Sequence, residues 1–253
     1  MEATQSFVKL LEVMDTLRAE CPWDKKQTFE TLRSLTIEET FELSEAIQNK
    51  DQNEIKKELG DVLLHIVFYC KMASEKEWFG IHDVMQSLIE KLIYRHPHIY
   101  GDIKAEDEAT VKQNWEKIKL KEKGNKGVLD GVPNSLPSLI KAQRMQEKAA
   151  QVGFDWDNKE QVWAKVEEEL LEFKQAKNKK EQQQELGDLL FAIVNYGRSA
   201  GINADDALEY TNRKFKNRFE YIEKKAKENN EELINLSLDQ MDYYWEESKN
   251  WYK

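Results

Sequence analysis

The stretch EETFELSEAI (38–47), followed by ELGDVLLHIVFY (58–69), decides the fold, because it combines carboxylates with apolar residues at helical spacing. In both segments apolar residues recur at intervals of three and four, which is the period of an α-helix. The chain then repeats the pattern, with VEEELLEFKQA (166–176) before ELGDLLFAIVNY (185–196). Such an internal repeat predicts two similar helical domains.

Composition and periodicity together predict an all-α protein. The 253 residues include only 10 glycines and 4 prolines, which favours long helices over turn-rich β architecture. No segment alternates between apolar and polar residues for long enough to indicate a strand. The spacing predicts helices over roughly 3–19, 28–48, 53–75, 81–95, 107–122, 138–151, 159–177, 180–199, 204–229 and 238–251.

The middle of the chain is rich in residues that interrupt helices. Residues 123–137 hold three of the 10 glycines and two of the 4 prolines. This composition is typical of a linker or long loop. We therefore predict an N-terminal domain over 1–122, a linker over 123–137 and a C-terminal domain over 138–253.

Charge and cysteine content exclude several classes of protein. The net charge of −10 argues against a nucleic-acid polymer as partner, since phosphate backbones bind basic surfaces. The N-terminus lacks the basic start of a secretory signal, and no apolar run reaches membrane length. Cys21 and Cys70 form no metal-binding CxxC motif and indicate reduced thiols. We expect a cytoplasmic protein with no membrane partner.

Each repeat carries four carboxylates that should converge. Glu39 and Glu42 lie three residues apart and share a helix face, as do Glu58 and Asp61. The short connection near Asp51 makes the two helices antiparallel neighbours. In the second copy the corresponding residues are Glu169, Glu172, Glu185 and Asp188.

Carboxylates beside apolar residues are costly to bury unless a cation joins them. Ligand sets made only of oxygen suit Mg²⁺, with Mn²⁺ as a substitute, better than zinc. A solvated acidic face is the alternative for any one such cluster. Its pairing across two helices, found twice, favours two metal sites and chemistry on a phosphorylated substrate.

Two pairs of cationic side chains follow the acidic segments at similar offsets. Lys91 and Arg95, and likewise Lys214 and Arg218, lie four residues apart and so share a helix face. Such a face can bind the outer phosphates of a triphosphate, and a solvated surface is the alternative. Trp245 and its aromatic neighbours near the C-terminus can stack on a base or simply pack against a helix.

At these residues the sequence resembles the MazG family of nucleoside triphosphate pyrophosphohydrolases in its two-domain form. The resemblance covers nearly the whole chain, and the combination of segments is far more specific than any single acidic motif. Besides the two acidic repeats, it rests on ECPWDKKQTFETL (20–32), KLIYRHPHIYG (91–101), VGFDW (152–156), NRKFKNRF (212–219) and MDYYWEE (241–247).

The resemblance implies an all-α fold of tandem MazG-like domains, assembled as a homodimer. It implies Mg²⁺-dependent hydrolysis of nucleoside triphosphates to the monophosphate and pyrophosphate. The implied metal ligands are Glu39, Glu42, Glu58 and Asp61 in the first half, and Glu169, Glu172, Glu185 and Asp188 in the second. In the second half Lys214 and Arg218 would contact the triphosphate, and Trp245 the base; Lys91 and Arg95 are their counterparts in the first half.

The two halves match the family pattern unequally. The family's fourth helix often carries Asn two residues before the Lys, as Asn212 does before Lys214, whereas Ile89 precedes Lys91. We therefore expect the C-terminal domain to be the main catalytic one. Glu181 departs from the pattern, because a basic residue can hold phosphate at that position in relatives. Either Glu168 or Glu172 would act as the general base.

Two further interpretations stay open. The unequal halves also fit a regulatory module that senses nucleotide or metal without turnover. A purely structural helical scaffold would explain the amphipathic pattern but not the acidic clusters found twice. The sequence does not select a nucleobase or sugar, and removal of noncanonical nucleotides is one role that the resemblance allows.

Overall fold

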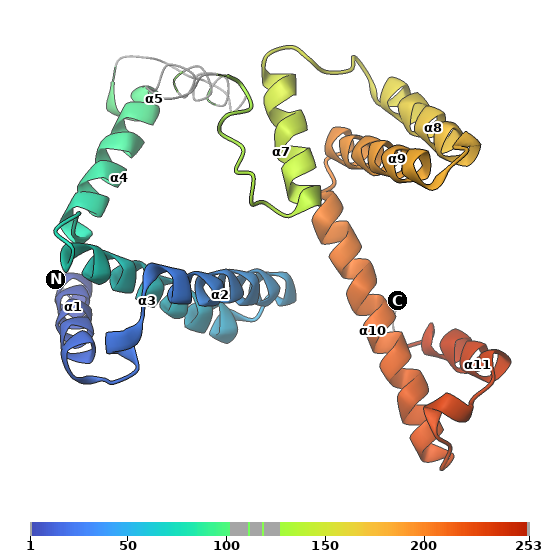
Figure 1. The fold of residues 1–253 in the computed structure, drawn as a ribbon, viewed down its shortest axis with the longest axis horizontal. Helices are drawn as coiled ribbons and strands as arrows, with labels where there is room; N and C mark the ends of the chain where they lie inside the picture. Colours follow the sequence, from blue (N-terminus) through green and yellow to red (C-terminus); the bar gives the residue numbers. More distant parts are fainter. Residues whose placement is uncertain (1, 102–110, 112–117, 119–126, 252–253) are drawn as a thin grey trace. The chain divides into compact units, whose positions relative to one another are not determined.

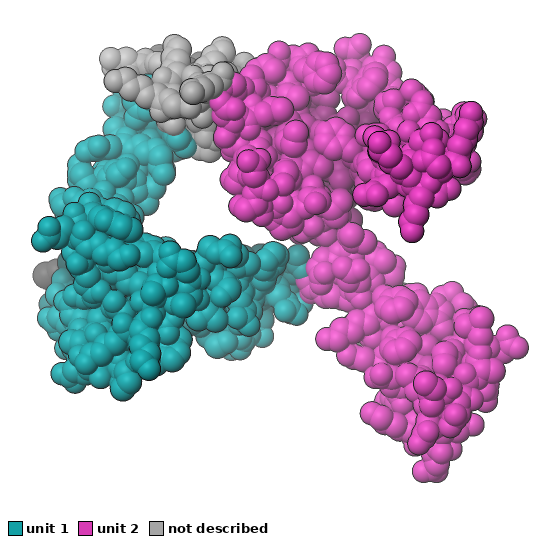
Figure 2. Space-filling model, in the orientation of Figure 1, with its two compact units in different colours: residues 1–106 teal, residues 107–253 magenta. Residues whose placement is uncertain are grey.

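The computed structural model describes residues 2–101, 111, 118 and 127–251. The chain divides into two compact units, Met1–Glu106 and Asp107–Lys253, which Figure 2 distinguishes by colour. The described residues form helices and no strand, which confirms the all-α prediction. None of the helices in the described ranges is long and apolar enough to span a membrane.

Unit 1 is built around an antiparallel pair of helices, α2 and α3 (Figure 1). The Thr28 side chain accepts from the backbone N–H of Thr31 and begins α2, and the Asp51 carboxylate likewise begins α3. Lys50, at φ 55°, makes the turn between them. The elements are α1 (Glu2–Glu20), η1 (Asp24–Lys26), α2 (Phe29–Asn49), α3 (Gln52–Ser74), α4 (Ile81–Arg95) and α5 (Pro97–Tyr100).

Unit 2 contains a second antiparallel pair, α8 and α9. Asn158 and Asn178 cap these two helices by accepting backbone N–H groups, and a connection at residues 176–178 joins them. The elements are α7 (Ser138–Gln151), α8 (Lys159–Gln175), α9 (Lys179–Ser199), α10 (Ala204–Glu228), η2 (Leu233–Asn235) and α11 (Leu238–Ser248).

The predicted helices agree closely with those that the structure describes. Among the predicted helices the largest difference is at α11, which ends at Ser248 rather than at residue 251. The short helix α5 (Pro97–Tyr100) was not predicted. The helix predicted over 107–122 lies outside the described residues, apart from positions 111 and 118. The domain bounds 1–122, 123–137 and 138–253 stay predictions.

The core of unit 1 holds α1 against the α2–α3 pair. It consists of the buried side chains Met14, Leu32, Val67, Phe68 and Met72. Burial of a large apolar side chain contributes about 1.5–3 kcal/mol relative to exposure, so this cluster fixes the three helices together. In unit 2 the buried apolar residues of the helix pair are Val162, Val166, Ala192 and Val194.

Helix α4 has an apolar face that the described residues of unit 1 leave partly exposed. It contains no buried residue. Its apolar side chains recur at helical spacing and are between 39% and 49% exposed: Met85, Leu88, Ile89, Leu92 and Ile93. A helix with such a stripe is normally covered by another element.

Candidate functional site

Helices α8 and α9 bring three carboxylates together in unit 2. One oxygen each of Glu169, Glu172 and Glu185 lies within 4.8 Å of the others. Glu169 is only 7% exposed, Glu185 is half-buried and Glu172 is exposed. Three negative charges at this separation repel one another strongly unless a cation or protons neutralise them.

Lys165 supplies part of that neutralisation. Its ammonium group donates to Glu169 at 2.6 Å and to Glu168 at 3.0 Å. These two hydrogen bonds, the one to Glu169 first, raise the pKa of Lys165 above its ordinary value. The lysine therefore stays charged. Among the described residues, no ion pair of this kind reaches Glu172 or Glu185.

The remaining negative charge affects the pKa of Glu185. Loss of hydration, followed by the nearby carboxylates of Glu172 and Asp188, raises the pKa of Glu185. A carboxyl group whose charged form is disfavoured in this way is a good place for a cation to bind.

Asp188 and Glu168 lie beside the three-carboxylate group rather than in it. Asp188 is exposed on α9, and Glu168 is exposed on α8 with its Oε1 bonded to Lys165. Their predicted roles as metal ligand and base stay predictions.

We call Glu169, Glu172 and Glu185 the second acidic group, because they lie in the second repeat. A cavity of about 590 Å³ opens beside this group. Its wall includes Lys165, Glu169 and Asp188 on the acidic side, and it continues over apolar residues of α7 and α9. The volume is typical of a site for a small organic ligand. An acidic cluster next to an apolar cavity suits a molecule with one end that is cationic or is held through a metal ion, and with one apolar end.

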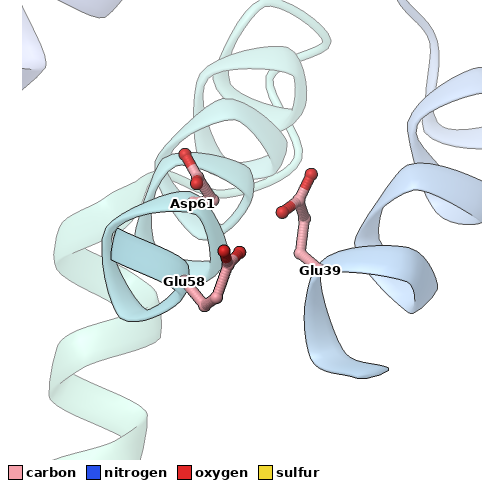
Figure 3. Close-up of side chains that lie close together, drawn as sticks. All are labelled: Glu39, Glu58 and Asp61. Carbon is pink, nitrogen blue, oxygen red and sulfur yellow. The ribbon is translucent and has the colours of Figure 1, made fainter. Parts of the chain in front are cut away.

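Unit 1 has a related acidic group, formed by Glu39, Glu58 and Asp61 within 4.8 Å of one another. Figure 3 shows Glu39 reaching from α2 towards Glu58 and Asp61 of α3. Loss of hydration, then the charges of Asp61, Glu42 and Glu58, raise the pKa of Glu39. Glu42 is exposed and is not part of the group.

The surroundings of the Glu58 carboxylate show whether these residues fit a metal ion. It is 2% exposed, and its Oε1 accepts from Lys57 at 2.7 Å. Its Oε2 is buried and has no hydrogen-bond partner in the described part of the chain. A buried carboxylate oxygen without a partner is costly, and a divalent cation among these oxygens would satisfy it. The donor set of the first group therefore fits a divalent cation such as Mg²⁺, and the second group offers a set of the same all-carboxylate kind.

The predicted cationic residues lie on other helices. Lys91 and Arg95 are on α4, and no residue of α4 belongs to the first acidic group. Lys214 lies with its ammonium 5.6 Å from the Tyr210 ring centroid, and the Arg218 guanidinium lies 5.5 Å from that of Trp245.

Asn212 donates to Glu209 on the same helix, α10. None of the described residues of α10 or α11 lines the cavity. The roles of Asn212, Lys214, Arg218, Trp245, Lys91 and Arg95 in binding substrate stay predictions.

Several residues of the cavity were not predicted from the sequence. Lys165 precedes Glu169 by four residues, a spacing that indicates an ion pair on one helix face. Asp155 pairs with Arg198 at 2.5 Å, and Arg198 also binds Asn195. For Asp155, Asn195 and Arg198 the sequence offered only the family resemblance, which includes the segments VGFDW (152–156) and ELGDLLFAIVNY (185–196).

Comparison with known protein families gives a match in each half. The MazG nucleotide pyrophosphohydrolase domain matches residues 27–100, and the phosphoribosyl-ATP pyrophosphohydrolase family matches residues 138–215. A mazG-related protein of Thermotoga maritima with a solved structure aligns at 26% identity and a TM-score of 0.40, over 45% of this chain and 98% of that chain.

Two curated proteins match the chain over almost its full length. The nucleoside triphosphate pyrophosphohydrolase/pyrophosphatase MazG of Thermotoga maritima is 44% identical, over 98% of this chain and 97% of its own. The nucleoside triphosphate pyrophosphohydrolase of Escherichia coli (strain K12) is 38% identical, over 95% of this chain and 96% of its own. With this identity and coverage, the chain belongs to the MazG family of nucleoside triphosphate pyrophosphohydrolases.

Proposed function

We propose that the protein is a Mg²⁺-dependent enzyme that hydrolyses nucleoside triphosphates between the α and β phosphates, giving the monophosphate and pyrophosphate. The observation that carries the proposal is the second acidic group, Glu169, Glu172 and Glu185, next to a cavity of about 590 Å³. The names of the two long matches support the activity. The ion, the location of the reaction and the substrate range are our proposals.

The carboxylates of the second group would hold the metal, with Asp188 joining them from the cavity wall. When bound, Mg²⁺ offsets the charge of the phosphate oxygens and of the leaving pyrophosphate. In the reaction a bond forms between water oxygen and the α-phosphorus, and the bond from that phosphorus to the bridging oxygen breaks.

The proton of the attacking water needs a base close to the group. Lys165 donates to the Oε1 atom of Glu168, so this oxygen is already engaged in an ion pair. Glu172 has no such partner among the described residues and is the exposed member of the group, to which it offers one of its two carboxylate oxygens. We therefore favour Glu172 over Glu168 as the general base.

The phosphates beyond the metal need cationic partners. Lys214 and Arg218 on α10, with Asn212 before them, are our candidates for the β and γ phosphates. Cations placed where charge develops stabilise the departing pyrophosphate.

The first acidic group is proposed to bind metal with little or no turnover. The position four residues before Glu39 is Leu35, where the second half has Lys165 before Glu169. The position of Asn195 in the second repeat is occupied by Phe68, which is 2% exposed in the unit 1 core. These apolar side chains remove the polar groups that the second half places beside its acids.

We propose that a second copy of the chain covers the apolar face of α4, which gives a homodimer. Five apolar residues at helical spacing, Met85, Leu88, Ile89, Leu92 and Ile93, are too many to leave in water on one short helix. Faces of this kind are typical of obligate helical interfaces.

The test is pyrophosphate release with Mg²⁺ over a panel of canonical and noncanonical nucleoside triphosphates, for wild type and for Glu172→Ala. We expect release that needs Mg²⁺ and that falls at least about 100-fold in the variant, because a preorganised contact to the transition state is lost. A folded wild-type protein that binds nucleotide and Mg²⁺ without releasing pyrophosphate would instead indicate the sensing module.

A further inference from the structure

The cavity beside the second acidic group has an apolar end that the metal chemistry does not use. Met145 and Ala149 of α7, Phe154 and Trp156 of the following loop, and Phe191 of α9 line it. Phe154 is 83% exposed, and Trp156 and Phe191 are nearly half exposed. Aromatic side chains left open around a cavity suit a flat, aromatic ligand that stacks on them.

One polar side chain in this wall has a fixed orientation. Arg198 donates to Asn195 Oδ1 from Nε at 3.0 Å and from Nη2 at 2.9 Å. Arginine has only donors, so the Asn195 atom that faces it must be the oxygen. The Asn195 amide nitrogen therefore points elsewhere, and within the described chain it has no hydrogen-bond partner.

Arg198 is itself held in place. It makes two hydrogen bonds to the Asp155 carboxylate, at 3.0 Å and 2.5 Å, and its side chain is only 15% exposed. Asp155 belongs to the loop that carries Phe154 and Trp156. The chain Asp155–Arg198–Asn195 thus fixes the aromatic loop and the amide donor together.

A second polar side chain in the wall offers a hydrogen-bond acceptor, whereas Asn195 offers a donor. Gln146 of α7 donates from Nε2 to the Phe191 carbonyl oxygen at 2.9 Å, which places its own oxygen on the other side. Gln146 is 7% exposed, and its Oε1 is buried with no partner in the described ranges. A ligand N–H reaching this oxygen would satisfy it.

We propose that this cavity binds the nucleobase of the substrate and that Asn195 is a specificity-determining residue, donating from Nδ2 to an acceptor atom of the base. Arg198 is a positioning residue, because it acts on the base only through Asn195. Gln146 accepts an N–H from the same base. The inference rests on the proposed function, and it places the base here rather than at Trp245.

The distances along α9 agree with this assignment. Asp188 and Asn195 both line the cavity and lie seven residues apart. At about 1.5 Å per residue this separates them by roughly 10 Å along the helix axis. A nucleoside can span such a distance, with its α-phosphate at the acidic end and its base at Asn195.

The experiment compares wild type with Asn195→Asp in steady-state hydrolysis of triphosphates that carry different bases, with tripolyphosphate as a base-free competitive inhibitor. Aspartate keeps an oxygen for Arg198 but replaces the donor in the cavity by an acceptor. We expect KM for the preferred nucleotide to rise at least about 10-fold, the preference among bases to shrink, and kcat to change less. The inhibition constant of tripolyphosphate should not change.

Four further variants make the result specific. Arg198→Met should also reduce the preference among bases, because it frees the Asn195 amide to rotate. Asn53→Asp, the same substitution at an exposed residue of unit 1, should behave as wild type. Trp245→Ala tests the rival location of the base, and Asn195→Ser replaces Asn195→Asp if the latter does not fold.

Each outcome is decisive. Unchanged base preference in a folded Asn195 variant, with wild type active, overturns the inference alone. Loss of preference in Trp245→Ala but not at Asn195 overturns it as well. Absence of turnover in wild type overturns the proposed function and the inference with it.

Discussion

Lys165 donates to Glu169 at 2.6 Å across one turn of α8, so a cation already touches the most buried carboxylate of the second acidic group. The lysine side chain is 35% exposed and that of Glu169 only 9%. The pair therefore lies at the boundary between solvent and core. Its ammonium group compensates a charge that would otherwise be partly buried without a partner.

We predict that Lys165→Met destabilises the metal-free protein. Removing the cation leaves Glu169 uncompensated, and we expect the free energy of unfolding to fall by about 1–2 kcal/mol after allowance for partial exposure. Added Mg²⁺ should recover part of this loss if it binds the same carboxylates. Urea unfolding with and without Mg²⁺ measures both effects.

The control is Lys174→Met, which removes an exposed lysine from the last turn of α8. It should leave the stability within about 0.5 kcal/mol of wild type. Equal stability of the two variants would show that Lys165 does not compensate Glu169.

The two repeats offer a matched pair of variants for locating the activity. Glu42 and Glu172 occupy the same position of the repeat, and both are exposed, so neither substitution by Ala should harm folding. Glu172 belongs to its acidic group, whereas Glu42 does not. We expect Glu172→Ala to reduce kcat/KM at least about 100-fold and Glu42→Ala to change it less than about threefold. Similar losses in both would place catalysis in both halves.

The fold could be predicted from the sequence because helical periodicity and capping residues are local. Asp51, Asn158 and Asn178 are strong N-cap residues, and each begins a helix within one residue of the predicted start. The end of α11 was predicted less well, because no glycine or proline follows Ser248. Local signals place helix starts better than frayed ends.

The acidic groups could be predicted in outline but not in membership. Spacing indicates that Glu169 and Glu172 share the face of α8 that meets Glu185 and Asp188 of α9. It does not show which three oxygens come together. Side-chain directions decide that Asp188 turns to the cavity wall while Asp61 joins the first group. The role of Asn195 depends on Arg198 and a distant loop, so no local pattern predicts it.

The ion pair between Asp155 and Arg198 predicts a pH dependence of stability. Hydrogen bonds from Arg198 lower the pKa of Asp155 below its ordinary value. A depressed carboxyl pKa stabilises the fold above the unfolded-state pKa, about 3.9, and the contribution is lost as the pH falls through the lower folded pKa. We expect Asp155→Asn to cost about 1 kcal/mol at pH 7 and progressively less as the pH falls below about 3.9.

Urea unfolding of wild type and variant between pH 7 and pH 2 measures this difference. Asp157→Asn is the control, since Asp157 is an exposed neighbour in the same loop and its carboxylate has no partner in the described part of the chain. A difference between wild type and Asp155→Asn that stays constant over this range would exclude the ion pair as its cause.

The apolar face of α4 predicts a dimer that a single charge can break. Leu88 and Leu92 lie one turn apart near the middle of the stripe and are 44% and 45% exposed. If a second copy covers them, Leu88→Glu places an unpaired charge in the interface, which costs several kcal/mol and weakens association at least about 100-fold. Light scattering coupled to gel filtration, over a range of concentrations, measures the mass.

Ser87→Glu adds the same charge on the opposite face of α4 and should leave the mass unchanged. A wild-type protein that stays monomeric at every concentration would show that the stripe is not an interface between copies.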